Sequence, residues 1–153
     1  MKIESKIEIT GIHKFIFRDA KTGKILRQKV YKNLIMNVGK NMVANRLAGT
    51  GNSCDITYGA VGTSAAAPAA DDTTLGTELD RVAVTAISAS GSIVNVVCFF
   101  GASDGNGTLT EFGHFGEAAT GAADSGTILN HVVISETKTS AETLTIESSI
   151  TIA

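Results

Sequence analysis

Apolar and polar residues alternate along most of this chain, with the period of two that is typical of β-strands. Near the N-terminus, Ile3, Ile7 and Ile9 are separated by charged or polar residues, and the segment HKFIFRD continues the alternation. The next residues, 19–24, read DAKTGK and supply the aspartate and glycine that tight turns require. The pattern therefore predicts a β-hairpin at the start of the chain.

The same alternation recurs in six later segments, which are separated by stretches rich in glycine and small residues. In the segment 142–152, Leu144, Ile146 and Ile150 lie on one side of a strand and threonine or glutamate on the other. The pattern predicts further strands within the following ranges: 56–62, 82–90, 92–100, 109–115, 127–135 and 142–152. Strands 82–90 and 92–100 are separated by Gly91 alone, which indicates a hairpin.

One segment departs from this period. In NVGKNMVANRLAG the apolar residues Val38, Met42 and Leu47 recur at helical spacing, with Asn37 as the expected N-cap and Gly49 as the expected C-cap. This predicts one short α-helix over about residues 38–48. Together the elements predict a mainly β fold: an antiparallel β-sandwich, jelly-roll-like, with one short helix and an N-terminal β-hairpin.

Charge divides the chain unevenly, although its net charge is only −2. Residues 1–50 carry a net charge of +8 and the remainder carries −10. We expect one compact domain in which residues 1–32 form a basic arm or hairpin on a β-sandwich body of residues 33–153. This asymmetry fits solvated faces, contact between complementary surfaces, or nucleic-acid binding. Nucleic acid is the least favoured, because the basic third offers few aromatic side chains for stacking.

No pattern for catalysis or cofactor binding is present. The sequence contains no phosphate-binding glycine loop with a lysine and no serine in a nucleophile elbow. Cys54 and Cys98 lie far apart and are expected to be buried free thiols, and the three histidines are expected to be structural. Glu78, Asp80 and Glu111 could meet in space as a carboxylate pair, but the chain has no tryptophan to stack on a sugar. We therefore expect no enzyme activity and no cofactor or metal.

No stretch is apolar and long enough to span a membrane, and residues 1–10 lack the continuous apolar run of a signal peptide. The segment from Tyr58 to Arg81 joins two predicted strands through small residues, the only proline and two adjacent aspartates. The proline and the aspartates predict a loop of fixed conformation across one end of the sandwich. It should contain a short turn from Thr73 whose apolar side is formed by Leu75 and Leu79.

Several segments in order resemble a family of small β-rich virion structural proteins of tailed bacteriophages, whose members are described as capsid decoration (cement), tail-fibre or baseplate-associated proteins. The resemblance covers about residues 33–152 and is carried by these segments: NLIMNVGKNMVANRLAG, ITYGAVGTSAAAPAADDTTLGTELDRVAV, LTEFGHFG, GTILNHVVIS and KTSAETLTIESSITI. His114 and Ser64 depart from the pattern. The resemblance implies a β-rich component of the particle without catalysis, located in the virion after assembly in the host cytoplasm.

From the resemblance and the charge pattern we expect a capsid decoration protein that binds the major capsid protein, or another virion protein, and associates with itself as a homotrimer. The alternatives are a tail-fibre or baseplate-associated protein and a β-sandwich carbohydrate-binding module. No membrane partner is expected. The candidate interaction residues are basic positions near the N-terminus and charged positions in the Tyr58–Arg81 loop: Lys2, Lys6, Lys14, Arg18, Asp71, Asp72, Glu78 and Arg81.

Overall fold

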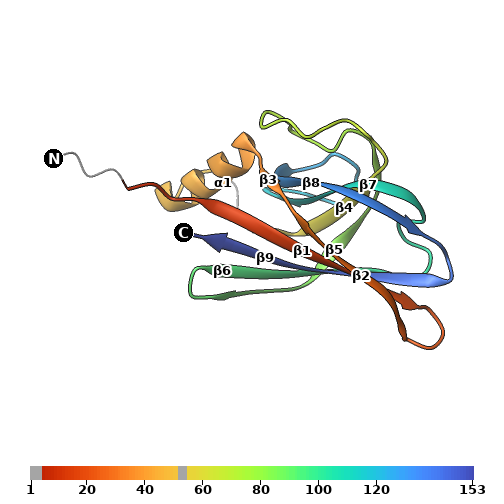
Figure 1. Ribbon diagram of the computed structural model, residues 1–153. Helices are drawn as coiled ribbons and strands as arrows, with labels where there is room; N and C mark the ends of the chain where they lie inside the picture. The colour runs from red at the N-terminus through yellow and green to blue at the C-terminus, as the bar shows by residue number, and fades with distance from the viewer. Residues whose placement is uncertain (1–4, 52–54) are drawn as a thin grey trace.

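The fold is mainly β and antiparallel, as the alternation predicts. The computed structural model describes residues 5–51 and 55–153 (Figure 1). Its elements are β1 (Ile9–Asp19), β2 (Ile25–Lys32), β3 (Leu34–Ile35), α1 (Asn37–Ala48), β4 (Tyr58–Gly62), β5 (Glu78–Ser90), β6 (Ile93–Phe100), β7 (Gly107–Gly116), β8 (Thr127–Lys138) and β9 (Glu142–Ile152). The predicted N-terminal hairpin is present as β1 and β2, and the predicted hairpin of residues 82–100 is present as β5 and β6.

The strands follow the order β2-β1-β9-β6-β5-β4-β7-β8-β3, and the sheet folds over to make two layers. Strand β5 belongs to both layers, because its first half pairs with β4 and its second half pairs with β6. On the far side, the outer strand β2 approaches β8, which is followed in the sheet only by the two-residue β3. There the Arg27 guanidinium of β2 donates to the Thr137 carbonyl of β8, and the Tyr31 hydroxyl donates to the Glu136 carboxylate. The sheet is therefore nearly closed.

The core lies between the two layers and follows the predicted alternation. Phe15 and Phe17 of β1, with Leu144 and Ile146 of β9, are completely buried. Cys98 of β6 is a buried free thiol, as expected, and burial raises its pKa to about 12. Cys54 lies outside the described residues.

Helix α1 packs on β8, and a glycine makes this close approach possible. A Cβ atom added to Gly39 would overlap the backbone of Leu129. Gly49 ends the helix in the left-handed conformation with φ of 65°, as predicted. The predicted N-cap is wrong by one residue: Met36 occupies that position, because its side chain is buried and its backbone N–H donates to the Leu129 carbonyl. Among the described residues, no helix is long and apolar enough to cross a membrane.

Candidate functional site

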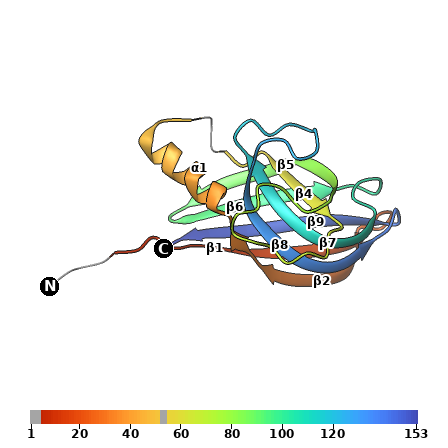
Figure 2. The same cartoon turned by 90° about the horizontal axis from the view of Figure 1, so that it is seen from above.

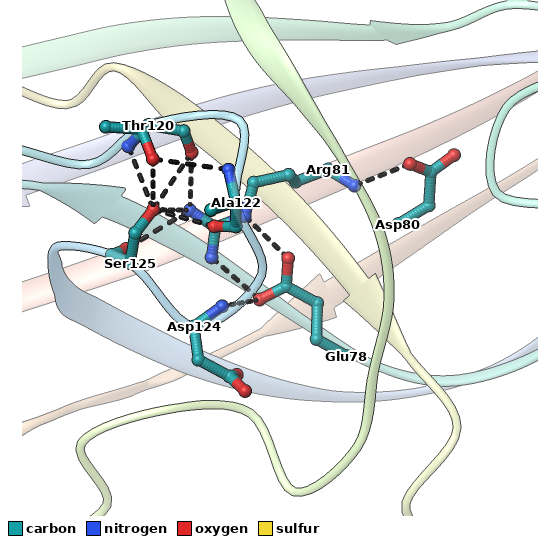
Figure 3. A network of polar contacts seen from close by, with 7 residues as sticks. All are labelled: Glu78, Asp80, Arg81, Thr120, Ala122, Asp124 and Ser125. Carbon is teal, nitrogen blue, oxygen red and sulfur yellow. Dashed lines mark hydrogen bonds and ion pairs between the residues drawn. The ribbon is translucent and has the colours of Figure 1, made fainter.

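The Tyr58–Arg81 loop is held at its C-terminal end by a buried arginine. The guanidinium of Arg81 forms two bonds with the Glu78 carboxylate, at 2.5 and 2.7 Å, and both side chains are 3% exposed or less (Figure 3). Its remaining terminal nitrogen, Nη1, donates to the carbonyl oxygens of Thr120 and Ser125 and contacts the Ser125 hydroxyl. One cation thus joins the start of β5 to the loop between β7 and β8.

The loop between β7 and β8, residues 117–126, adopts a backbone conformation that needs such support. Glu117, Ala118 and Asp124 all have positive φ, between 47° and 67°, in the region that non-glycine residues rarely occupy. The backbone N–H of Asp124 donates to the Glu78 carboxylate at 3.0 Å, and the Arg81 guanidinium lies 4.6 Å from the centre of the Phe115 ring. The buried ion pair therefore fixes the shape of a second loop.

A second buried carboxylate holds the middle of the Tyr58–Arg81 loop. Glu111 of β7 is 1% exposed and accepts hydrogen bonds from the backbone N–H groups of Ser64, Gly76 and Thr77. These bonds draw the loop across the outer face of β7 and β8, as Figure 2 shows, rather than across the end of the sandwich. Leu75 is consequently buried, whereas Leu79 is 43% exposed and already lies in β5. The predicted turn with both leucines on one side is therefore wrong.

His131 of β8 connects this carboxylate to the outer part of the loop. Its Nε2 lies 2.9 Å from Glu111 and its Nδ1 lies 3.0 Å from Asp72. Hydrogen bonds to both carboxylates require a proton on each ring nitrogen or a proton on one carboxyl group. Asp72 also accepts from the backbone N–H of Ala69, and Asp71 accepts from the side-chain amide of Asn37. Both aspartates therefore tie the loop to its surroundings.

The predicted interaction residues thus occupy two different settings. In the loop, Glu78 and Arg81 are buried against each other, while Asp71 is exposed and Asp72 partly exposed. At the basic end, Lys6 is exposed and Lys14 and Arg18 are partly exposed, whereas Lys2 lies outside the described residues. The structure therefore does not bring the basic and acidic candidates into one site.

The basic hairpin keeps its outer face charged. The register of β1 with β2 and of β1 with β9 puts Lys14, Arg18 and Lys32 on the face opposite the core-facing phenylalanines. Arg18 bonds only to a threonine hydroxyl on β9, at 3.2 Å. In contrast, Arg27 lies over the Phe17 ring and pairs with Glu142 and Glu136. The outer face of β1 and β2 thus carries several cations, and the exposed Glu147 of β9 lies opposite Lys14 on that face.

The carboxylates considered for catalysis each have their own structural partners. Glu78 binds Arg81, Glu111 binds the loop and His131, and Asp80 accepts from the backbone N–H of Gly105. Among the described residues, no group of three or more His, Cys, Asp or Glu side chains is placed to hold a metal ion. The polar groups of this region therefore serve to position two loops.

A polar cluster lies deep between the layers. His13 Nδ1 is 2.8 Å from the Ser148 hydroxyl, and the Asn130 side chain lies between the rings of His13 and His114. Both histidines are completely buried. Burial lowers the pKa of His13 to about 4 and, with the neighbouring His13, lowers that of His114 to about 3. The histidines are structural, as expected, and neutral at pH 7.

The Glu111–His131–Asp72 connection is the feature that sequence patterns miss. Glu111 and His131 lie in segments that read as ordinary strands, and their partners are far away in sequence. One signal was available: Gly113 interrupts the apolar residues of LTEFGHFG, and in the structure a Cβ atom at this position would meet Leu75 of the covering loop. Glycines on one side of a strand leave room for a covering loop.

Comparison with family models, curated protein sequences and solved structures finds no match to this chain. The resemblance to phage virion proteins therefore stays a hypothesis.

Proposed function

We propose that this chain is a non-enzymatic structural protein of a bacteriophage virion, a decoration (cement) protein that binds the head lattice through the outer face of β1 and β2. The observation that carries the proposal is the distribution of charge. Lys14, Arg18 and Lys32 share one outer face, and the turn that follows β1 adds Lys21 and Lys24. Such a face is suited to an acidic protein surface.

The loops support the same proposal. Two carboxylates and one arginine are buried to hold loops whose exposed residues are mostly small, such as Ala66, Ala67 and Ala122, together with the acids Asp71 and Asp124. Burying charge costs free energy, and a fixed loop shape is what the protein gains in return. A fixed, small-residue surface is suited to close packing against neighbouring proteins in a particle, where large flexible side chains would lose entropy.

Purified particles of the phage that encodes this chain provide the first test. Mass spectrometry should detect the chain at hundreds of copies on the head, whereas a tail or baseplate component would be present at a handful of copies. Absence of the chain from the particle would reject the proposal. Binding of glycans by the isolated chain would instead favour a carbohydrate-binding module.

The second test measures binding of the purified chain to particles that lack it. Binding should weaken as ionic strength rises from about 0.05 to about 0.5 M, because exposed charges are screened. Replacing Lys14 and Lys32 together by glutamate should weaken binding by about tenfold or more. Lys40→Glu with Arg46→Glu, a matched double reversal on α1, should leave it unchanged. Equal loss in both variants, or no salt dependence, would show that the β1–β2 face is not the contact.

A further inference from the structure

Among the described residues, part of strand β5 has one edge without a neighbouring strand. Residues Glu78–Ala83 pair with β4, but from Val84 onward β5 pairs with β6 alone. The Val84 N–H donates to the Thr57 carbonyl at 2.9 Å. Beyond this bond, the described part of the chain supplies no backbone partner to the outer edge of residues 86–90. A strand edge of this kind is a template for pairing with another strand.

The sequence does not protect this edge. Between Arg81 and Asp104 the chain has no charged residue and no proline, although proteins ordinarily use both to block strand pairing. The edge of β2 is different, because it carries Arg27, Lys29 and Lys32 and is approached by β8. The uncharged edge of β5 is therefore suited to a protein partner.

An apolar groove lies beside this edge, between α1 and the β5–β6 hairpin. It has a volume of about 290 Å³, and its wall is mostly aliphatic, with Leu47 from α1, Ile87 and Val94 from the hairpin, and Ile152 from β9. Arg46 and Asp55 also line it. Leu47 is 79% exposed and Ile87 is 48% exposed. A strand paired with β5 would place alternate side chains over this groove.

The N-terminal segment has the strand pattern, yet its described residues 5–8 lie outside any strand. Alternation begins at Ile3, yet β1 begins only at Ile9, and the ladder to β9 extends just to the backbone pair of Glu8 with Ala153. Ile7 is 70% exposed. Figures 1 and 2 show the chain leaving the body here, at the same end as α1 and the β5–β6 turn.

We propose that residues 3–7 of a second copy add as a strand to the outer edge of β5. Ile3 and Ile7 share one face of an extended segment and enter the groove, while Lys2, Glu4 and Lys6 face solvent. The contact joins two different surfaces, so it repeats head to tail and closes into a ring when the geometry allows, as in the expected homotrimer. The inference rests on the proposed function only in taking a second copy as the partner.

Sedimentation velocity on the full-length purified chain tests the contact without any particle. The wild-type chain should assemble. Deletion of residues 2–7, which removes the strand, and Ile87→Lys, which places a charge beside the edge, should each raise the dissociation constant at least about tenfold. Leu26→Lys is the matched control: it changes an aliphatic residue of similar exposure on the other edge strand, and it should assemble like the wild type.

Mixing the two defective chains gives the sharpest result. The deletion variant keeps its β5 edge and Ile87→Lys keeps its N-terminal strand, so an equimolar mixture should form a dimer of one chain of each kind. Circular dichroism establishes that both variants are folded, and Ala89→Lys replaces Ile87→Lys if that variant is not.

Three results would overturn the inference. The first is a wild-type chain that stays monomeric up to about 100 µM, because strand addition with two buried isoleucines should be evident at that concentration. The others are a deletion variant that still assembles and an equimolar mixture that stays monomeric. Binding of the monomeric wild type to particles, lost on deletion of residues 2–7, would show that the segment adds to the head lattice instead. Particle binding by the β1–β2 face would then still stand, so the two proposals fail separately.

Discussion

Mild acid should destabilise this protein at pH values above the range in which ordinary carboxylates titrate. His13 and His114 are completely buried, and their pKa values are lowered from 6.5 to about 4 and about 3. Between pH 6.5 and about 4 the unfolded chain therefore binds protons at these positions and the folded chain does not. The free energy of unfolding must fall as the pH falls through this window.

The size of the effect follows from the pKa difference. Each pH step below 6.5 costs about 1.4 kcal/mol per histidine, so lowering the pH from 7 to 5 should remove about 2 kcal/mol for each, or about 4 kcal/mol together. This is a large share of the roughly 5–15 kcal/mol that stabilises a typical domain. Urea unfolding followed by circular dichroism at pH 7, 6 and 5 measures it.

His114→Phe isolates one histidine from the other titrating groups. The His114 ring packs edge-on against Phe112, and the Asn130 oxygen that it contacts also accepts from the His114 backbone N–H. Phenylalanine therefore leaves that oxygen with a partner. The variant should lose about 2 kcal/mol less stability than the wild type between pH 7 and 5. An unchanged pH dependence would refute the assignment of acid sensitivity to the buried cluster.

Three further outcomes are expected. Arg81→Met should lower the free energy of unfolding by roughly 3–5 kcal/mol, because it leaves the Glu78 carboxylate buried without its cation, and adding Glu78→Gln should recover part of the loss in chemical denaturation. Gly39→Ala should cost about 1–3 kcal/mol in the same assay, because its Cβ overlaps the Leu129 backbone, whereas Asn41→Ala on the exposed side should be neutral. Cys98 should resist iodoacetamide at pH 8 until the protein unfolds, as mass spectrometry of the labelled chain would show, since burial raises its pKa to about 12.

The elements were predictable where a strand has one face in water. In β9, Leu144, Ile146, Ser148 and Ile150 are buried and the residues that alternate with them are more exposed, so a period of two appears in the sequence. The helix was predictable from its break in period and from Gly49. Its start was not, because the burial of Met36 and its bond to β8 are tertiary contacts that overrule the preference of Asn37 for the cap.

The candidate site was less predictable for a related reason. The sequence drew attention to Glu78 and Arg81 as charged residues in a distinctive loop, but it could not show that they neutralise each other in the interior. The partners of Glu111 could not be predicted, because three of its bonds go to backbone N–H groups, which every residue but proline has. A side chain that binds backbone groups needs no partner of a particular residue type, so the sequence contains no pattern that indicates the contact.

The two ends of the molecule differ in whether buried charged side chains hold the backbone in place. At the loops, Arg81 and Glu111 hold backbone segments in one shape, and replacing either residue removes bonds to groups that are already buried. Residues 86–90 of β5 carry no charge, and in the described part of the chain their outer edge has exposed aliphatic side chains and no neighbouring strand. The groups at the loops form their hydrogen bonds within one chain. The β5 edge has backbone groups to which another strand can bond and apolar side chains that it can cover. A partner that adds a strand is therefore expected at the β5 edge, and a partner that packs on a preformed surface is expected at the loops.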